Sequence, residues 1–186
     1  QQKVSLDVKK IVSGLAAGFI VAGFVALSRT FLTSEIMPLW AEFSALDNWL
    51  PFLAAGSSPV QGFIAQTTIF MLLFTAITRF SQNWSRRKIL FGLLLIAAVF
   101  ILNGLSLQTI NYWLVSGLAT GLIYLVLYIY LIRHHLALVP LVIGGTVILG
   151  IIKQIAFNAY PAAIFGNMIA LVVIIAISIY GSKMLE

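Results

Sequence analysis

The side chains that could carry chemistry in this sequence are few, and the most prominent is a lysine inside an apolar run. Lys153 and Gln154 interrupt the stretch GIIKQIAFNAYP after a long uncharged segment. An ammonium group there could pair with Glu35, Glu42 or Asp47, or could bind an anionic lipid or substrate. The alternative is a lysine whose carbon chain lies along apolar surface while its charge reaches the membrane interface.

Further polar side chains stand within the apolar runs and could line a path for a small solute. Amide and hydroxyl groups in such runs also form hydrogen bonds between helices, each contributing roughly 1 kcal/mol. Both roles stay open for Gln66, Thr67, Asn103 and Asn167.

The composition leaves little room for catalysis or metal binding. The absence of cysteine excludes a disulfide, a thiolate metal site and a cysteine nucleophile. All five acidic residues lie outside the apolar runs, so an intramembrane aspartyl protease or a proton-driven pump would lack its carboxylate. No histidine falls in the sixth run to assist Ser116 as in a rhomboid-like protease. We predict no catalytic residue, no cofactor and no metal, with an enzyme of unrecognised type as the exception.

The two histidines stand next to each other. Side chains adjacent on a helix point about 100° apart, so His134 and His135 make a poor metal site by themselves. We expect them to form an interfacial turn with Arg133, and a pH sensor is the alternative.

The elements that must position these residues are apolar helices. The chain is 61% hydrophobic and 9% charged, whereas globular proteins are about 45–50% apolar and about 25% charged. A helix needs about 20 apolar residues to cross a bilayer, and hydrocarbon offers the backbone no other partner. We predict one membrane domain over residues 1–186, an all-α integral membrane bundle of six transmembrane helices. The predicted spans are 11–28, 60–78, 89–107, 110–132, 136–157 and 162–182.

Several span boundaries carry helix-start signals. Ser58 is expected as an N-cap with Pro59 at the first helical position, and Pro161 is expected to begin the sixth span. The short stretch LSLQTI predicts a tight antiparallel hairpin of the third and fourth spans.

The distribution of cations predicts the orientation. In a six-span layout every lysine and arginine except Arg29 and Lys153 falls on the side of the termini. The positive-inside rule makes that side cytoplasmic. We therefore expect a multi-pass protein of the plasma membrane, the bacterial inner membrane, with both termini cytoplasmic. Anionic lipid is the expected partner of the basic loop formed by Arg86, Arg87 and Lys88.

The long connection at 29–59 reads as an outer interfacial segment. Within it, 38–50 has the apolar spacing of an amphipathic helix, with Trp40 and Trp49 beside the apolar face and with Glu42 and Asp47 on the same stretch. We predict a helix lying on the outer leaflet. Its role is either a surface lid over the bundle or a gate or docking face for a partner.

Pairs of glycines four residues apart predict close helix packing. Gly14 and Gly18 lie in the first span, and Gly117 and Gly121 lie in the fourth. Such pairs let helix backbones approach closely in lipid. The contact is either within the chain or with a second membrane protein or second copy.

Three stretches together resemble the membrane region of long-form members of the CAAX-processing and bacteriocin-processing (CPBP) intramembrane protease family. They are MPLWAEFSALDNWLPFLAAG, TRFSQNWSRRKILFG and LIRHHLALVPLVIGG. The family's paired glutamates with a following arginine, and its downstream histidines, are not found, and SSPVQGFIAQTTIF stands where the glutamates are expected. The resemblance implies a non-catalytic half or a degenerate member, to which no catalytic residue carries over.

The function that follows is a non-catalytic membrane-embedded module that scaffolds or binds a partner, as part of a larger membrane enzyme or transporter. The alternative is a membrane subunit that transports or binds a small solute. A scaffold predicts a closely packed interior, whereas a transport subunit predicts a cavity open to the outer surface. The expected partners are the bilayer and another membrane protein or a second copy, and nucleic acid is excluded.

Overall fold

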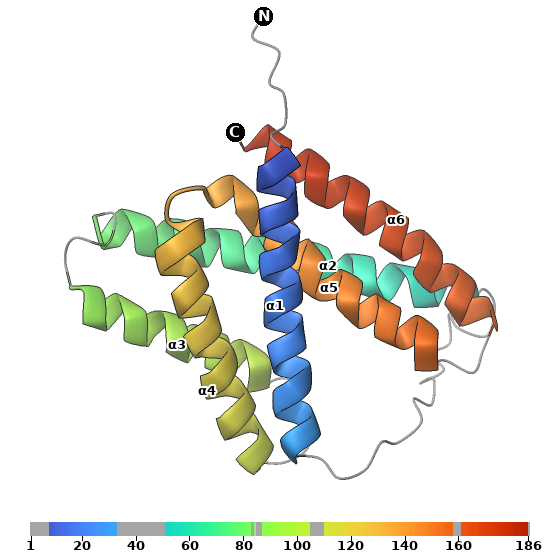
Figure 1. Ribbon diagram of the computed structural model, residues 1–186, viewed down its shortest axis with the longest axis horizontal. Coiled ribbons are helices and arrows are strands. Elements are labelled where there is room, and N and C mark those ends of the chain that lie inside the picture. Colours follow the sequence, from blue (N-terminus) through green and yellow to red (C-terminus); the bar gives the residue numbers. More distant parts are fainter. Residues whose placement is uncertain are drawn as a thin grey trace, which may run out of the picture.

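The computed structural model describes residues 8–32, 51–82, 84, 87–104, 110–157 and 161–185, which are helical apart from short turns. No strand occurs within these ranges, so the predicted all-α class is confirmed. The elements are α1 (Val8–Leu32), α2 (Pro51–Phe80), α3 (Lys88–Gly104), α4 (Ile110–Leu127), the π-helical turn η1 (Tyr128–Ile132), the 3-10 turn η2 (Leu136–Leu138), α5 (Val139–Phe157) and α6 (Pro161–Met184) (Figure 1).

Five of these helices are long and apolar enough to cross a membrane: α1, α2, α4 continued by η1, α5 and α6. The exception is α3, which has 17 residues and an apolar part over Lys88–Leu102. Its predicted span continues to residue 107, beyond the part of the chain that the structure describes. The six membrane crossings therefore stay a prediction. The structure itself contains five helices that are long and apolar enough to cross a membrane.

The start of α2 corrects one sequence prediction. The helix begins at Pro51, and Pro59, expected in that place, lies inside it. Proline is tolerated at a first helical position because its missing N–H would be unpaired there anyway. Residues 51–59 of the predicted outer segment therefore belong to α2, and Ser58 is not an N-cap. The predicted interfacial helix, with Trp40, Glu42, Asp47 and Trp49, lies outside the described residues.

The first and fifth helices run in the same chain direction, cross at a steep angle (Figure 1) and touch through glycines. A Cβ atom at Gly14 would lie 2.7 Å from the Leu141 Cβ, and one at Gly18 would lie 2.8 Å from the Gly145 Cα. A Cβ at Gly18 would also overlap the carbonyl oxygen of Val142. Backbone therefore meets backbone, and both helices advance in the same direction along the contact.

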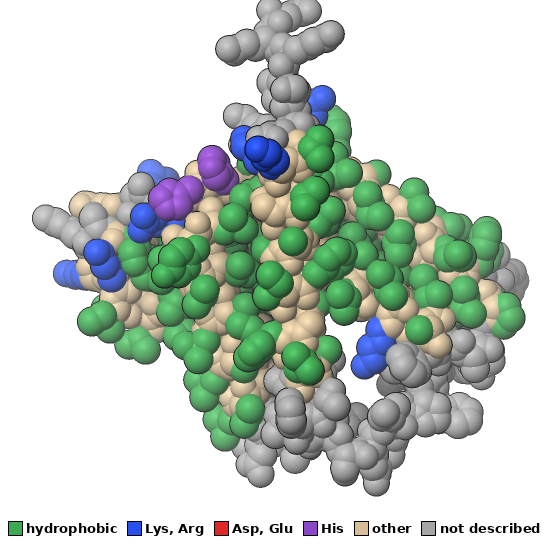
Figure 2. Space-filling view, in the orientation of Figure 1, with side chains coloured by type: hydrophobic (Ala, Val, Ile, Leu, Met, Phe, Trp, Pro, Cys, Tyr) green, Lys and Arg blue, Asp and Glu red, His purple; other side chains and the backbone are tan. Residues whose placement is uncertain are grey.

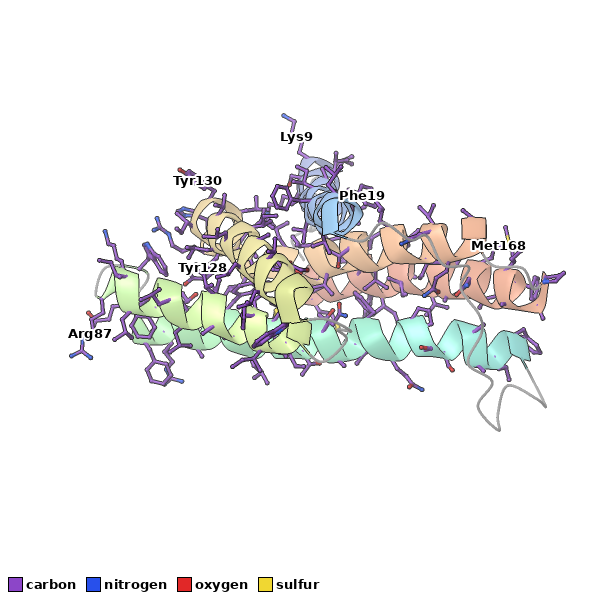
Figure 3. All side chains as sticks on the ribbon, turned by 90° about the horizontal axis from the view of Figure 1, so that it is seen from below. Lys9, Phe19, Arg87, Tyr128, Tyr130 and Met168 are labelled. Carbon is purple, nitrogen blue, oxygen red and sulfur yellow. The ribbon has the colours of Figure 1, made fainter. Side chains whose placement is uncertain are left out.

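The second and sixth helices also run in parallel. A Cβ at Gly56 would lie 2.9 Å from the Gly166 oxygen, and farther along Phe63 and Ser178 both approach Gly144 of α5. In Figure 3, α2 lies along the lower edge of the molecule, and α5 and α6 lie above it.

The third and fourth helices form an antiparallel pair, as the short connection predicted. A Cβ at Gly117 would lie 2.6 Å from the Phe100 ring, and one at Gly121 would lie 3.0 Å from Ile96. At the far end of the pair Gly92 faces Leu125. Pro140 of α5 contacts Gly181 of α6, so these two helices are also antiparallel. As a result, α1, α3 and α5 start at the end of the bundle where α2, α4 and α6 end.

The core is centred on the first half of α5 and on an aromatic cluster between α2 and α4. Residues 137–145 are all buried. The rings of Phe70 and Tyr124 stack at 4.5 Å between centroids, and those of Phe74 and Tyr128 lie 5.6 Å apart. Each offset pair of rings contributes beyond the apolar area it buries.

Candidate functional site

Lys153 and Gln154 lie exposed in the last turns of α5. They stand at the end of the helix opposite to its buried start. The acidic residues proposed as partners of Lys153 belong to the ranges that the structure does not describe. A salt bridge at Lys153 therefore stays a prediction.

The polar residues proposed to line a solute path do not form one group. Gln66 is exposed on α2, whereas Thr67 Oγ1 is buried without a hydrogen bond to a described residue. Asn167 is 2% exposed, and its Oδ1 also lacks such a bond. The pairing of α2 with α6 places Thr67 level with Ser178, about 16 Å along α6 from Asn167. The side chain of Asn103 lies outside the described residues.

Ser178 is a buried polar residue that the sequence analysis missed. Its Oγ has no hydrogen bond to a described residue, and a Cβ at Gly144 would overlap it. A hydroxyl in an apolar helix usually bonds to a carbonyl one turn back. Thr68 and Thr120 do so, at 2.9 Å to Ile64 O and 2.6 Å to Ser116 O. The small and polar residues at 167, 170, 178 and 182 share one face of α6 with Ile174, and this spacing was the available signal.

At the end of the bundle where α2 and α4 end, Tyr128 and Trp84 pack together and form hydrogen bonds. Thr78 donates to Phe74 O at 2.7 Å, so the Tyr128 hydroxyl donates to Thr78 Oγ1 at 2.8 Å. The Trp84 indole meets the Tyr128 ring edge-on at 5.3 Å, and the backbone N–H of Trp84 donates to Ser81 Oγ at 2.9 Å. These contacts tie the turn after α2 to the end of α4.

That turn holds three non-glycine residues in the left-handed region. Gln82 and Arg87 have φ of 49°, and Trp84 has φ of 65°. This conformation costs roughly 1–2 kcal/mol for a residue with a side chain. Trp84 is held there by its contacts with Ser81 and Tyr128, whereas the Gln82 side chain is exposed.

Replacing Gln82 with glycine is expected to raise the free energy of unfolding by about 0.5–1 kcal/mol, because glycine adopts this φ without strain. The measurement is unfolding in mixed micelles titrated with SDS. Ala97→Gly on the exposed side of α3 is the matched control and should lose about 1 kcal/mol. A loss of stability in Gln82→Gly would contradict the strain argument.

Most described cations gather at the end of the bundle where α1 and α3 start and α2 and α6 end. They are Lys9, Lys10, Arg79, Arg87, Lys88, Arg133 and Lys183, while Lys153 lies toward the opposite end. Figure 2 shows blue and purple side chains around these helix ends, with apolar surface between them and the far end. No Asp or Glu occurs within the described ranges. We call this the basic end.

A shallow surface depression of about 600 Å³ lies at the basic end, at the start of α3. Arg87 and Lys88 lie on one side of it, followed by the apolar side chains of Ile89, Leu90 and Leu93. The depression therefore combines two cations with an exposed apolar strip. Nearby, Arg133 Nε is buried without a described partner, and its Nη2 lies 3.4 Å from His134 Nε2.

The described residues contain no group of three His, Cys, Asp or Glu side chains that could hold a metal ion. Comparison of the chain with protein-family models, with curated proteins and with solved structures found no match.

Proposed function

We propose that this chain is a non-catalytic integral membrane module that binds a partner in the membrane, with its basic end in the cytoplasm. The main supporting observation is that the charged side chains lie away from a tightly packed interior. The described cations lie near helix ends. Between those ends, helix backbones touch at two glycine pairs, Gly18 with Gly145 and Gly56 with Gly166. Such contacts leave no room for a solute path along these two interfaces. This function agrees with a CPBP-like chain lacking the paired glutamates, a kinship that stays a prediction.

Six crossings are part of the proposal. The directions of the helices support it, since successive crossings would place the starts of α1, α3 and α5 at one end, as the glycine and aromatic contacts do. The 17 residues of α3 span about 25 Å, slightly less than the hydrocarbon thickness of about 30 Å. Residues up to 107 would complete this span. The cation excess at the basic end supports cytoplasmic termini, and the bacterial inner membrane is the proposed location.

Transport of a small solute is the weaker candidate. It requires a continuous polar path, yet Gln66 is exposed on α2 and the two buried groups, Thr67 and Asn167, lie far apart along the bundle. A scaffold requires only a rigid interior and an accessible binding face. The proposed interfacial helix at 38–50 would add to that face as a lid or docking surface.

Anionic lipid is the proposed partner at the basic end. The double variant Arg87→Gln and Lys88→Gln should weaken retention of phosphatidylglycerol by about 30-fold, because each cation contributes about 1 kcal/mol near an anionic surface. Native mass spectrometry of the protein released from nanodiscs measures the retained lipid. Arg79→Gln is the control, since it removes a charge at the same end but outside the depression. Equal loss in the control would mean a diffuse surface effect.

The proposed function is tested by mild extraction of the chain from its native membrane, followed by mass spectrometry of the intact complex. We expect a second membrane chain in fixed stoichiometry. Gly18→Val, which should separate α1 from α5, should also lose that chain, whereas Gly23→Val should retain it. A protein that carries a bound small solute and no second chain would overturn the proposal in favour of transport.

A further inference from the structure

Arg133 differs from the other described cations of the basic end because one of its nitrogens is buried. Its Nε is shielded from solvent and has no hydrogen-bond partner among the described residues. Most of the other cations at this end have exposed side chains, namely Lys9, Arg79, Arg87, Lys88 and Lys183. Water can solvate those charges, whereas the Nε–H of Arg133 depends on what lies next to it within the fold.

The π-helical turn η1 accounts for this burial. The backbone N–H of Arg133 donates to Tyr128 O at 2.9 Å, five residues back rather than four. In a regular α-helix residue 133 would point about 140° away from residue 128, and the wider turn brings it back toward the same side. That side is the interior, because Tyr128 is fully buried while Tyr130 is exposed and points away from the bundle (Figure 3). Single π-helical turns are frequent at functional sites.

The buried Nε–H needs an acceptor that the described part of the chain does not supply. A guanidinium stays protonated, carries five N–H donors and has no acceptor of its own. Its Nη2 reaches His134 Nε2 at 3.4 Å on the exposed side, which leaves Nε unsatisfied. No Asp or Glu occurs within the described ranges. A buried charged donor without an acceptor has lost its hydration without replacement, and an anion would restore the missing bond.

Acidic residues elsewhere in the chain are the first alternative to an external anion. The three acidic residues between α1 and α2 follow the end of α1 that lies away from the basic end. Asp7 and Glu186 stand close in sequence to the start of α1 and to the end of α6, outside the described residues. These two carboxylates are therefore the groups that must be separated experimentally from an external anion.

Among external anions, a phosphate group matches the chemistry of this guanidinium. Nε and the neighbouring Nη form one edge of a planar fork, which donates two parallel bonds to two oxygens of one phosphate. The positive charge of Arg79, Arg87 and Lys88 at the same end adds to the attraction. At the end of a membrane-crossing helix, such a phosphate comes either from a lipid headgroup or from a soluble phosphate ester.

We propose that Arg133 binds one phosphate group through the Nε edge of its guanidinium, at the π-helical end of α4. The site is distinct from the depression at the start of α3, whose lining includes Arg87 and Lys88 and not Arg133. It goes beyond the proposed function, because it requires neither a second membrane chain nor a bound solute.

Modification of arginine by phenylglyoxal, mapped on peptides by mass spectrometry, tests the site in the unsubstituted chain. The chain in neutral detergent micelles is compared with and without phosphatidylglycerol, and separately in inorganic phosphate and in chloride at equal ionic strength. Saturating ligand should slow the modification of Arg133 at least about tenfold and leave that of Arg79, an exposed arginine of the same end, within about twofold.

The two probes distinguish the sources of the phosphate. Slowing by phosphatidylglycerol alone identifies a lipid headgroup, whereas slowing by inorganic phosphate identifies a site that also accepts soluble phosphate. Equal slowing at Arg133 and Arg79 would show a diffuse surface effect and overturn the site, as would unchanged rates with both probes. Either failure leaves the partner-binding function standing, since that function is measured by co-purification of a second chain.

A second measurement separates the fork from the charge. Arg133→Lys keeps the charge but loses the paired donors, so the concentration of the protecting probe that gives half-maximal thermal stabilisation should rise about tenfold. The background for this comparison carries Arg87→Gln and Lys88→Gln, which remove the cations of the depression. Arg79→Lys in the same background should leave that concentration unchanged. Equal shifts for Arg133→Lys and Arg79→Lys would overturn the assignment to Arg133.

The carboxylates of the chain itself are tested by combining Asp7→Asn with Glu186→Gln. Without phosphate, Arg133 in this double variant should react with phenylglyoxal at the same rate as in the parent chain. Faster modification of Arg133, with Arg79 unchanged, would assign the guanidinium to one of these carboxylates and overturn the phosphate site.

Discussion

Gly18→Val is expected to lower the free energy of unfolding by about 3 kcal/mol or more. A Cβ at Gly18 would overlap the Val142 carbonyl oxygen and would lie 2.8 Å from the Gly145 Cα. Both neighbours are backbone atoms of α5, so the helices must move apart as a whole. Unfolding in mixed micelles titrated with SDS measures the change.

Gly23→Val on the same helix is the matched control. Among the described residues, no atom outside the surrounding turn of α1 lies within 4 Å of a Cβ at Gly23, so the substitution should change stability by less than about 0.5 kcal/mol. Similar losses at Gly18 and Gly23 would show that α1 and α5 do not pack through Gly18. If Gly145→Ala on α5 also lowers the free energy of unfolding, the effect of Gly18→Val belongs to the interface between α1 and α5.

Phe74→Ala is the second large expected loss, about 3–5 kcal/mol, because it removes a fully buried ring from the aromatic cluster. The Phe74 ring lies 5.6 Å from those of both Phe70 and Tyr128, so the cavity would open between α2 and α4. The same SDS titration measures it. Near-ultraviolet circular dichroism should report the loss of ordered aromatic packing.

Phe165→Ala on α6 controls for the chemistry of the substitution. This ring is 60% exposed, so its loss should cost less than about 1 kcal/mol. If Phe74→Ala were as mild, the interface between α2 and α4 would not contribute to the stability of the bundle.

Hydropathy predicted the lengths of the helices because crossing hydrocarbon requires a minimum apolar run. The predicted span 110–132 agrees with α4 continued by η1, and 162–182 agrees with α6 to within two residues at each end. It failed at α2, where FLAAGSSP reads as a loop. There Gly56 lies against Gly166, and this tertiary contact outweighs the poor helix propensity of glycine and serine.

Faces of the helices were less predictable than their lengths. When every side of a helix is apolar, the sequence does not show which side meets another helix, so the close approach of Gly144 to Ser178 is visible only in the folded chain. Gln66 and Thr67 are adjacent in sequence yet differ in exposure, since neighbours on a helix point about 100° apart. The approximate extent of most helices was readable from sequence, whereas the direction of each side chain around its helix axis was not.

The parallel contact between the first and fifth helices has a consequence for biogenesis. During synthesis at about 5–20 residues per second, the interval between Gly18 and Gly145 takes about 6–25 s. If the first helix crosses the membrane as proposed, it would spend that time without its contact with the fifth helix. A ribosome that stalls before the fifth helix should therefore leave a truncated product that membrane quality-control proteases remove, however well its earlier helices have inserted.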